Sequence, residues 1–510
     1  MTYLTTSDAR LLGQNRQEKD TSRKSNLRIA NLARCGINRY SDWRSGCAVF
    51  LLCVAAAIAS PAQSFTVLHS FDGTHGGSPR GALVQATDGN FYGSASIGGP
   101  TGICSNGCGT LFKITPGGAL STLHDFNGMA GFYPTGALVQ TPAGSFYGAT
   151  AGGGDSGVKC YIFKQSGCGT LFELTPSGSF LSLHSFDGSD GSEPLGLALG
   201  NNGNFYGVAE WGGTDDNGTV FETTPSGTFT LLFNFAESGA IPGGLIAATD
   251  GNFYGTSEYG GTESAGQVFQ VTPSGTVTTL YSFCGGGDCT DGSNPMAGVI
   301  QGTDGDLYGT TYVGGASGSG TIYQVTQSGV ATLLYTFGSQ AFAQIPMVQG
   351  TDGNFYGVTL QGGTNDDGMI FEITPDGALT TLYSFCPLSG CADGAYPASP
   401  LIQGTDGIFY GSTISGGATG YGVVFSLDVG LGPFVETLPA MGRAGAPVKI
   451  LGTDLTGATS VTFNGTPATF TVASPSLIRT TVPTGATTGR VRVTTPSGTL
   501  TSNVVFRVGP

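Results

Sequence analysis

Two glutamates and their aromatic neighbours are the side chains of this sequence that could do chemistry. Glu210-Trp211 and Glu258-Tyr259 occupy the same place in two successive copies of a repeated unit, directly before a Gly-Gly pair. Two neighbouring carboxylates can act as acid and base on a glycosidic bond, and aromatic rings can stack on apolar sugar faces. The pattern indicates a sugar-binding surface, or a carbohydrate-active hydrolase or lyase with Glu210 and Glu258 as candidate catalytic residues.

The other units hold different side chains at the same two positions. They read Ser96-Ile97, Ala151-Gly152, Tyr312-Val313, Leu360-Gln361 and Ile414-Ser415. We expect Trp211, Tyr259 and Tyr312 to bind a ligand. The alternative is that the aromatic rings only cover the edges of the fold and that both glutamates are solvated.

The unit that positions these residues is marked by the stretch Thr87-Asp-Gly-Asn-Phe-Tyr-Gly93. Seven copies place their tyrosines at Tyr92, Tyr147, Tyr206, Tyr254, Tyr308, Tyr356 and Tyr410. A fixed unit of about 50 residues predicts a repeat architecture. Short runs of Val, Ile, Leu, Phe, Tyr and Thr between glycine-rich turns are typical of strands.

Each unit is predicted to form four strands, a to d, which in the first unit are residues 83–85, 91–95, 111–114 and 120–126. Asp88-Gly89 predicts a type I′ hairpin turn between strands a and b. The recurring Phe, Tyr and Leu positions are expected to pack between units. Three histidines, His69, His124 and His184, fall where other units have aromatic residues in strand d, so we interpret them as packing residues.

The two ends of the repeat region complement each other. Residues 65–71 are an unattached copy of strand d, and the seventh unit ends at 423–427 without that strand. We therefore predict an all-β fold in which residues 64–430 form a seven-bladed β-propeller closed by the N-terminal strand. A linear solenoid is the alternative, but it would need caps, and the sequence shows none.

Loops of two kinds are expected on the two faces of this propeller. The a–b and c–d turns are short and nearly the same in every unit, whereas the b–c and d–a loops vary in length and content. A rigid scaffold that presents variable loops on one face is typical of binding sites. We place any functional site on this variable face.

Eight cysteines fall in the variable loops as four local pairs. The pairs are Cys104/Cys108, Cys160/Cys168, Cys284/Cys289 and Cys386/Cys391. An even number of cysteines behind an export signal predicts disulfides. A zinc site is the alternative for the closely spaced pair Cys104/Cys108, but we expect no metal and no cofactor.

Residues 1–63 are interpreted as a leader with a signal peptide. The apolar run at 47–59 is short for a membrane span and ends in small residues, as a signal-peptide core does. An uncleaved anchor is the alternative. We expect a secreted or cell-surface protein, with no stable membrane span after cleavage.

The charge of the chain excludes one class of partner. The formal net charge is −15 at pH 7, and the basic residues within 64–430 are Arg80, Lys113, Lys159 and Lys164. Such a surface repels phosphate backbones, so we expect no nucleic acid. The sequence also shows no phosphate loop and no Gly-x-Ser-x-Gly elbow.

From residue 431 the pattern changes to half-buried strands that alternate apolar and polar residues. Residues 431–510 are predicted to form a small immunoglobulin-like β-sandwich. We expect no membrane anchor at the C-terminus, because the last residues given are not an apolar tail.

Two family resemblances follow from these motifs. The units resemble the GloVer repeat of bacterial exported "choice-of-anchor" proteins, through Asp250-Gly-Asn-Phe-Tyr-Gly255, Gly260-Gly261, Thr272-Pro-Ser-Gly275 and Thr279-Leu-Tyr-Ser-Phe283. The C-terminal part resembles an IPT/TIG domain, through Val448-Lys-Ile-Leu-Gly-Thr453 and Ala458-Thr-Ser-Val-Thr-Phe-Asn-Gly465. The first resemblance implies export without an assigned chemistry, and the second implies a spacer or adhesion module.

These features lead to one favoured function and one alternative. We expect an exported, non-catalytic binding or structural protein of the bacterial cell surface that recognises an extracellular glycan or protein on the variable face. The alternative is a carbohydrate-active hydrolase or lyase that uses the same face.

Overall fold

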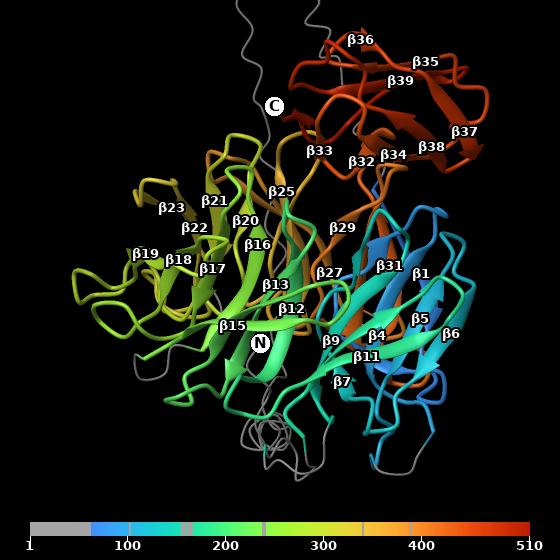
Figure 1. Cartoon of the computed structure of the whole chain (residues 1–510). Helices are drawn as coiled ribbons and strands as arrows, with labels where there is room; N and C mark the ends of the chain where they lie inside the picture. The colour runs from blue at the N-terminus through green and yellow to red at the C-terminus, as the bar shows by residue number, and fades with distance from the viewer. Residues whose placement is uncertain are drawn as a thin grey trace, which may run out of the picture. The chain divides into compact units, whose positions relative to one another are not determined.

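The computed structural model describes residues 63–100, 104–154, 160, 167–236, 241–338, 341–387 and 390–509. This part of the chain is built from β-strands and contains no helix (Figure 1). The leader prediction for residues 1–63 therefore lies outside the described residues, apart from Gln63. None of the described elements is a helix of the length and apolarity that a bilayer crossing needs.

Seven antiparallel sheets follow one another along the repeats, and we number them one to seven. The first contains β2 (Gly77–Pro79), β3 (Val84–Gln85), β4 (Phe91–Ile97), β5 (Thr110–Ile114) and β6 (Leu120–Asp125). The second contains β7 (Phe132–Pro134), β8 (Val139–Gln140), β9 (Phe146–Gly152), β10 (Thr170–Leu174) and β11 (Phe180–Ser185). The third contains β12 (Ser192–Leu199), β13 (Phe205–Trp211), β14 (Thr219–Thr223) and β15 (Phe229–Asn234).

The remaining four sheets repeat this arrangement. The fourth contains β16 (Pro242–Ala247), β17 (Phe253–Ser257), β18 (Gln267–Val271) and β19 (Val277–Ser282). The fifth contains β20 (Ile300–Gln301), β21 (Leu307–Thr310), β22 (Thr321–Val325) and β23 (Ala331–Thr336). The sixth contains β24 (Val348–Gln349), β25 (Phe355–Thr359), β26 (Met369–Ile373) and β27 (Leu379–Ser384). The seventh contains β28 (Ala395–Pro397), β29 (Ile402–Gln403), β30 (Phe409–Ser415), β31 (Val423–Asp428) and β1 (Ser64–Ser70).

The a–b turn differs from the predicted type I′ hairpin. The Gly89 amide donates to the Ala86 carbonyl, and the Ala86 amide donates to the Asn90 carbonyl. Gly89 has a positive φ of 81°, whereas Asp88 does not have one, so the prediction is wrong. The turn spans residues 86–89 with glycine as a bulge residue, and it leaves the Asp88 carboxylate free to accept from the Asn90 amide and the Tyr92 hydroxyl.

The first strand of a unit also begins earlier than predicted. In the first sheet β2 pairs with β4 ahead of β3, and in the third sheet β12 is continuous from Ser192 to Leu199. The predicted segment corresponds to the second half of this strand. A proline, Pro79 or Pro194, lies near the start of this strand. Proline ordinarily interrupts a strand, which explains why the prediction began the strand too late.

Phe and Tyr of the repeated motif pack neighbouring sheets together, as the sequence predicts. The Tyr206 ring of the third sheet lies 4.1 Å, between centroids, from the Phe253 ring of the fourth. The same contact joins Tyr92 to Phe146, Tyr147 to Phe205, Tyr308 to Phe355, Tyr356 to Phe409 and Tyr410 to Phe91. In the remaining pair Leu307 takes the place of phenylalanine, and it is buried in one cluster with Tyr254. The last of the ring contacts joins the seventh sheet to the first.

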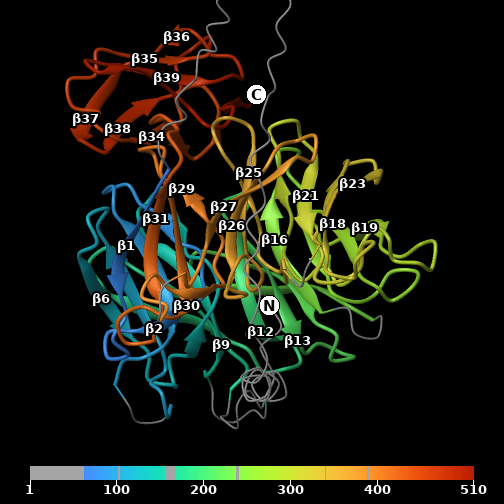
Figure 2. The same ribbon diagram turned by 180° about the vertical axis from the view of Figure 1, so that it is seen from behind.

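The N-terminal strand β1 lies beside β31, as Figures 1 and 2 show. The two strands are antiparallel, and Ser64 pairs with Asp428. Phe65 of β1 stacks on Tyr383 of the sixth sheet at 3.9 Å. Phe180 and Phe229, in the same place of β11 and β15, stack at 3.9 Å on His124 and His184 of the preceding sheets. β1 thus makes the contact that a fourth strand makes elsewhere.

The C-terminal part contains two four-stranded sheets and a short parallel pair. One sheet contains β32 (Val435–Leu438), β34 (Pro447–Gly452), β37 (Phe470–Ser474) and β38 (Leu477–Thr481). The other contains β35 (Ser460–Phe463), β36 (Thr466–Pro467), β39 (Val491–Thr495) and β40 (Gly498–Thr501), and the pair joins β33 (Met441–Gly442) to β41 (Arg507–Val508). Ile450 and Ile478 of the first sheet share one buried cluster with Val461 and Val493 of the second. The cluster has the face-to-face packing of a β-sandwich.

The tyrosine hydroxyls of the motif give a first testable prediction. Tyr254 Oη donates to Asp250 Oδ2 at 2.7 Å and accepts from Gln270 Nε2 at 2.7 Å. Replacing Tyr254 by Phe keeps the ring contact but removes both hydrogen bonds, so we expect the free energy of unfolding to fall by about 1–2 kcal/mol. Denaturant unfolding measures the change, and Tyr421→Phe, at an exposed ring, serves as the control. Equal effects of the two substitutions would contradict the structural role of the Tyr–Asp bond.

Candidate functional site at the start of the first strands

The first strands of all seven sheets converge on one cavity. It has a volume of about 210 Å³ and is lined mainly by apolar residues. Each sheet contributes to its lining: Ala82, Ala137, Leu197, Leu245, Val299, Pro346 and Pro400. Arg80 is the one charged residue among those lining it. Strand a runs past this cavity from the d–a loop to the a–b turn, so its first residues lie at the end of the cavity that faces the variable loops.

One position near the start of each first strand has an unusual backbone. It is occupied by Ser78, Tyr133, Glu193, Ile241, Asn294, Phe342 and Tyr396 in the seven units, and we call these the pre-proline positions. Proline follows in six of the seven, and alanine follows Phe342. All seven have a positive φ, from 32° at Ile241 to 57° at Glu193. Side chains other than glycine pay a steric cost in this region, and such strain is often found at functional sites.

A glycine lies two residues before the pre-proline position in several units, because neighbouring strands leave no room for a Cβ atom there. Gly191 has a φ of 138°, and a Cβ there would lie 2.7 Å from the Ala209 Cβ and 2.8 Å from Thr219 Oγ1. The same constraint applies at Gly131 and Gly292, where a Cβ would lie within 2.4 Å of a threonine hydroxyl. In these three units the backbone before the pre-proline position is thereby held in one shape, while the side chain at that position differs between units.

A second set of residues lies directly opposite the first across the a–b strand pair. These facing positions are Ser96, Ala151, Glu210, Glu258, Tyr312, Leu360 and Ile414. Ser192 pairs with Trp211 and Pro194 with Ala209, which places Glu193 opposite Glu210. The amides of Glu258 and Tyr312 donate to the carbonyls of Ile241 and Asn294. The residues before each Gly-Gly pair, which the sequence singled out, therefore meet the pre-proline residues.

The two sets divide into an acidic and an apolar side. The third and fourth sheets contribute Glu193, Glu210 and Glu258. The fifth to seventh sheets contribute rings and aliphatic side chains, and Phe342, Tyr396 and Ile414 pack against one core cluster with Leu360. The Tyr312 ring stacks on Phe342 with 4.9 Å between centroids. The carboxylates thus belong to the third and fourth sheets, whereas the rings of Phe342 and Tyr396 pack against the core.

The glutamates are buried, so the alternative in which both are solvated is wrong. Glu210 is 2% exposed and Glu258 is 6% exposed. Burial raises the pKa of Glu210, and the Glu258 carboxylate raises it further. Burial also raises the pKa of Glu193 to about 8, together with the charges of Glu210 and Asp216. Loss of hydration and nearby like charges both disfavour an ionised carboxylate, which explains the direction.

The three aromatic residues predicted to bind a ligand lie on consecutive sheets. Trp211 ends β13 opposite Ser192 and is half-buried. Tyr259 is 37% exposed, and burial together with the Glu258 carboxylate raises the pKa of its hydroxyl. Tyr312 lies at a facing position and is half-buried against Phe342. The structure thus places Tyr259 beside Glu258 and Tyr312 among the facing residues.

Sequence reasoning missed the pre-proline residues, above all Glu193, Tyr133 and Tyr396. A signal for them was present. Gly191-Ser-Glu-Pro194, Gly292-Ser-Asn-Pro295 and Gly394-Ala-Tyr-Pro397 repeat a Gly-x-x-Pro pattern in which the residue before proline varies. A residue that varies at a constant position of a repeat is a candidate for contacting a ligand.

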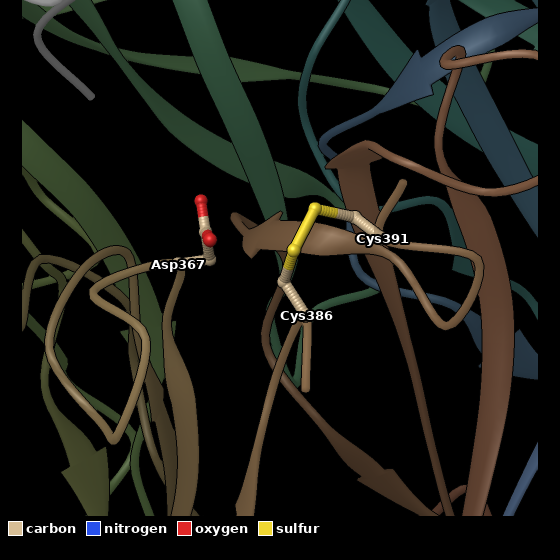
Figure 3. Close-up of side chains that lie close together, drawn as sticks. All are labelled: Asp367, Cys386 and Cys391. Atoms are coloured by element: carbon tan, nitrogen blue, oxygen red, sulfur yellow. A yellow bond between two sulfur atoms is a disulfide. The ribbon is translucent and has the colours of Figure 1, made fainter. Parts of the chain in front are cut away.

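All four predicted disulfides are present. They join Cys104 to Cys108, Cys160 to Cys168, Cys284 to Cys289 and Cys386 to Cys391. Figure 3 shows Asp367 beside the last of them. Asp367, Cys386 and Cys391 are the one cluster of three possible metal-ligating groups in the described residues. The two cysteines are joined in a disulfide, and cysteine binds a metal only as a free thiolate.

Comparison with known families accounts for most of the chain. The Gloeobacter/Verrucomicrobia repeat matches residues 56–166, 157–349 and 338–458. The chain belongs to this repeat family. The IPT/TIG domain matches residues 434–508, which contain the C-terminal sandwich. No curated protein matches the sequence.

Solved structures similar to this repeat protein include β-propeller-like proteins. A structure described as streptogramin B lyase is 14% identical, with a TM-score of 0.50, and the match covers 72% of this chain and 97% of the other. The virginiamycin B lyase of Staphylococcus aureus is 13% identical, with a TM-score of 0.49, and covers 72% and 98%. The extracellular domain of a hybrid two-component system of B. thetaiotaomicron is 11% identical, with a TM-score of 0.50, and covers 86% and 58%. At these identities the likeness concerns the fold alone.

Proposed function

We propose that the seven sheets are the blades of a β-propeller closed by β1, comprising residues 64–430, followed by an IPT/TIG sandwich at residues 431–510. Two contacts support closure of the ring. β1 pairs with β31 and stacks on the sixth sheet as other fourth strands do. The Tyr410–Phe91 contact repeats, between the last sheet and the first, the contact found between consecutive sheets.

The protein is, on this proposal, exported and acts outside the cytoplasm. Its four disulfides form in oxidising compartments such as the periplasm or the cell exterior. Residues 1–63 would act as the leader and be removed. The IPT/TIG sandwich would serve as a spacer or adhesion module.

The function that the geometry supports best is recognition of an extracellular glycan at the end of the cavity that faces the variable loops. The observation that carries this proposal is the pair of pre-proline and facing positions, where one backbone shape presents a different pair of side chains in every unit. Trp211, Tyr259 and Tyr312 would stack on sugar rings, and the buried carboxylates would bind polar groups of the ligand. A recessed site of rings and a few polar groups suits a small ligand better than a flat protein surface.

One observation favours a second candidate, a carbohydrate-active hydrolase or lyase. Glu210 has a raised pKa and is buried close to Glu258. A carboxyl group with a raised pKa close to a second carboxyl group is the arrangement of a general acid and its partner. The catalytic candidate would use Glu210 as the acid and Glu258 as the base or nucleophile.

A glycan array followed by mass spectrometry of the products tests both candidates. We expect a glycan class to bind without being cleaved, and Trp211→Ala or Tyr259→Ala to weaken binding at least tenfold, which is about 1.4 kcal/mol. Leu333→Ala, at an exposed residue of β23, should leave binding unchanged. If the protein cleaves a glycan and Glu210→Gln abolishes the cleavage, the enzymatic function is favoured over the binding function. Absence of any glycan binding would contradict the proposal and favour a protein partner.

A further inference from the structure

The cavity bounded by the first strands has an apolar part and a polar part. The third, fourth and fifth sheets line it with apolar side chains and glycines only, among them Leu245 and Val299. Polar side chains enter the lining from the first, second and sixth sheets, as Arg80, Thr135 and Gln344. A ligand that matches this lining has an apolar body and one polar end.

The three polar residues occupy the same place in the repeat, because each follows the pre-proline position of its unit by two residues. A Cβ atom on Gly81, the residue after Arg80, would lie 2.6 Å from the carbonyl oxygen of Gly136, the residue after Thr135. Burial raises the pKa of the Tyr133 hydroxyl in the second sheet, and the charge of Arg80 partly offsets this rise. Arg80 and Thr135 therefore belong to two first strands that run close together.

Arg80 gives the cavity a positive charge in a chain that is otherwise acidic. The formal net charge is −15, and the basic side chains among the described residues of 63–430 are Arg80 and Lys113. Lys113 Nζ lies 2.8 Å from Asp88 Oδ2, whereas the described residues that line the cavity include no aspartate or glutamate. A guanidinium beside apolar walls attracts an anion more strongly than one in bulk water, because a lower dielectric constant screens the charges less.

Thr135 adds a polar atom without a partner. The residue is 6% exposed, and its Oγ1 makes no hydrogen bond in the described structure. A threonine hydroxyl can donate and accept, and rotation about its Cα–Cβ bond can direct it toward a ligand oxygen. Folded proteins rarely leave a buried polar atom unpaired. Thr135 thus offers a hydrogen-bond donor on the strand next to that of Arg80.

The size and charge of the cavity limit what it can hold. A cavity of about 150 Å³ holds a benzene ring, so the volume of about 210 Å³ here suits a ring or short chain that carries a small acidic group. One guanidinium balances one negative charge, and its planar donors match a carboxylate through two parallel hydrogen bonds. A phosphate with a charge near −2 would need a second cation, which the described lining does not contain.

We propose that this cavity binds a small monocarboxylate with an aliphatic or aromatic body. The Arg80 guanidinium would pair with the carboxylate, and the Thr135 hydroxyl and the Gln344 amide would donate hydrogen bonds to the same end of the ligand. The apolar body would lie against Leu245 and Val299. This activity goes beyond glycan recognition and does not depend on it, because it uses none of the rings and carboxylates proposed to bind the glycan.

A pair of ligands that differ in charge tests the proposal on the full chain. Isothermal titration with phenylacetate is compared with titration with phenylacetamide, which has nearly the same shape but no charge. We expect phenylacetate to bind at least about tenfold more tightly, as a charge-assisted pair predicts, and Arg80→Met to reduce this preference to less than threefold. Lys113→Met, which removes the basic side chain paired with Asp88 outside the cavity, should keep the preference.

A second variant tests the cavity without changing its charge. Ala137 lines the cavity, and Ala137→Phe should fill it and abolish phenylacetate binding. Thermal unfolding of each variant checks that it folds. If Arg80→Met does not fold, Ala137→Phe still decides whether the cavity is the binding site, and the comparison of acid with amide on the parent still decides whether charge matters.

The outcomes separate this inference from the proposed function. Equal binding of acid and amide would overturn it, as would a preference for the acid that persists in Arg80→Met or acid binding that persists in Ala137→Phe. Failure of phenylacetate, benzoate and hexanoate to bind at millimolar concentration would also overturn it, and a positive glycan array would then leave glycan recognition standing. Acid binding together with a silent array would contradict glycan recognition and leave the carboxylate site standing.

Discussion

A chain without residues 64–70 should lose its cooperative unfolding transition and self-associate. The deletion removes β1, which pairs with β31 from Ser64 to Ser70. It leaves the backbone groups of β31 unpaired along one edge. It also uncovers the rings of Tyr383 and Phe425, whose centroids lie 3.9 and 5.2 Å from the centroid of the Phe65 ring. An exposed strand edge beside apolar rings is a site for pairing with another chain. Size-exclusion chromatography and denaturant unfolding measure the result.

A point substitution makes the same test quantitative. Phe65→Ala should lower the free energy of unfolding by about 3 kcal/mol, near the low end for phenylalanine, because Phe65 is only partly buried. Phe180→Ala is the matched comparison, since Phe180 occupies the same place in β11 and stacks on His124 at the same 3.9 Å. Closure predicts similar losses for the two. A loss at Phe65 below about one third of the loss at Phe180 would indicate a fraying terminal strand and contradict the closed ring.

The stability of the protein should fall as the pH rises from 5 to 8, and Glu193→Gln should flatten much of that slope. The folded-state pKa of Glu193 is raised to about 8 by burial and by Glu210 and Asp216. Between the unfolded pKa near 4.5 and this value, the folded chain holds a proton that the unfolded chain has released. Stability is therefore highest below this window and is lost as pH rises through it, by up to about 1.4 kcal/mol per pH unit.

Denaturant midpoints at pH 5, 6, 7 and 8 measure this dependence for the parent and for Glu193→Gln. Glu263→Gln is the control, because it removes an exposed carboxylate from the b–c loop of the fourth sheet. We expect Glu193→Gln to gain stability relative to the parent at pH 8 and little at pH 5. A parent protein that is equally stable or more stable at pH 8 would contradict the raised pKa of Glu193.

The packing of the fold could be predicted from the sequence because it depends on short repeated signals. The Phe-Tyr pair of each unit indicated contacts between units, and the contact of Tyr206 with Phe253 confirms them. The local cysteine spacing indicated the disulfides for the same reason. The turn type at Asp88 was wrong because the Asp88 carboxylate accepts from Asn90 and Tyr92, and this side-chain bonding outweighs the preference of an Asp-Gly pair.

Only some residues of the candidate site could be predicted from the sequence. Glu210 and Glu258 could be found from their place before the Gly-Gly pair, but their burial depends on residues from other strands, which a local pattern does not contain. Glu193 was missed because it lies between Gly191 and Pro194, and glycine and proline in such a short segment are typical of a loop. In the structure those residues start a strand in which Glu193 has a positive φ opposite Glu210.

The fluorescence of Trp211 tests most directly whether a ligand binds at the proposed end of the cavity. The chain has two tryptophans, Trp43 and Trp211, so a Trp43→Phe variant reports on Trp211 alone. We predict that a glycan identified on the array shifts the emission of Trp211 and protects it from a soluble quencher, with the same dissociation constant that titration calorimetry gives. A ligand that binds without changing the emission or the quenching of Trp211 would contradict the placement of the site.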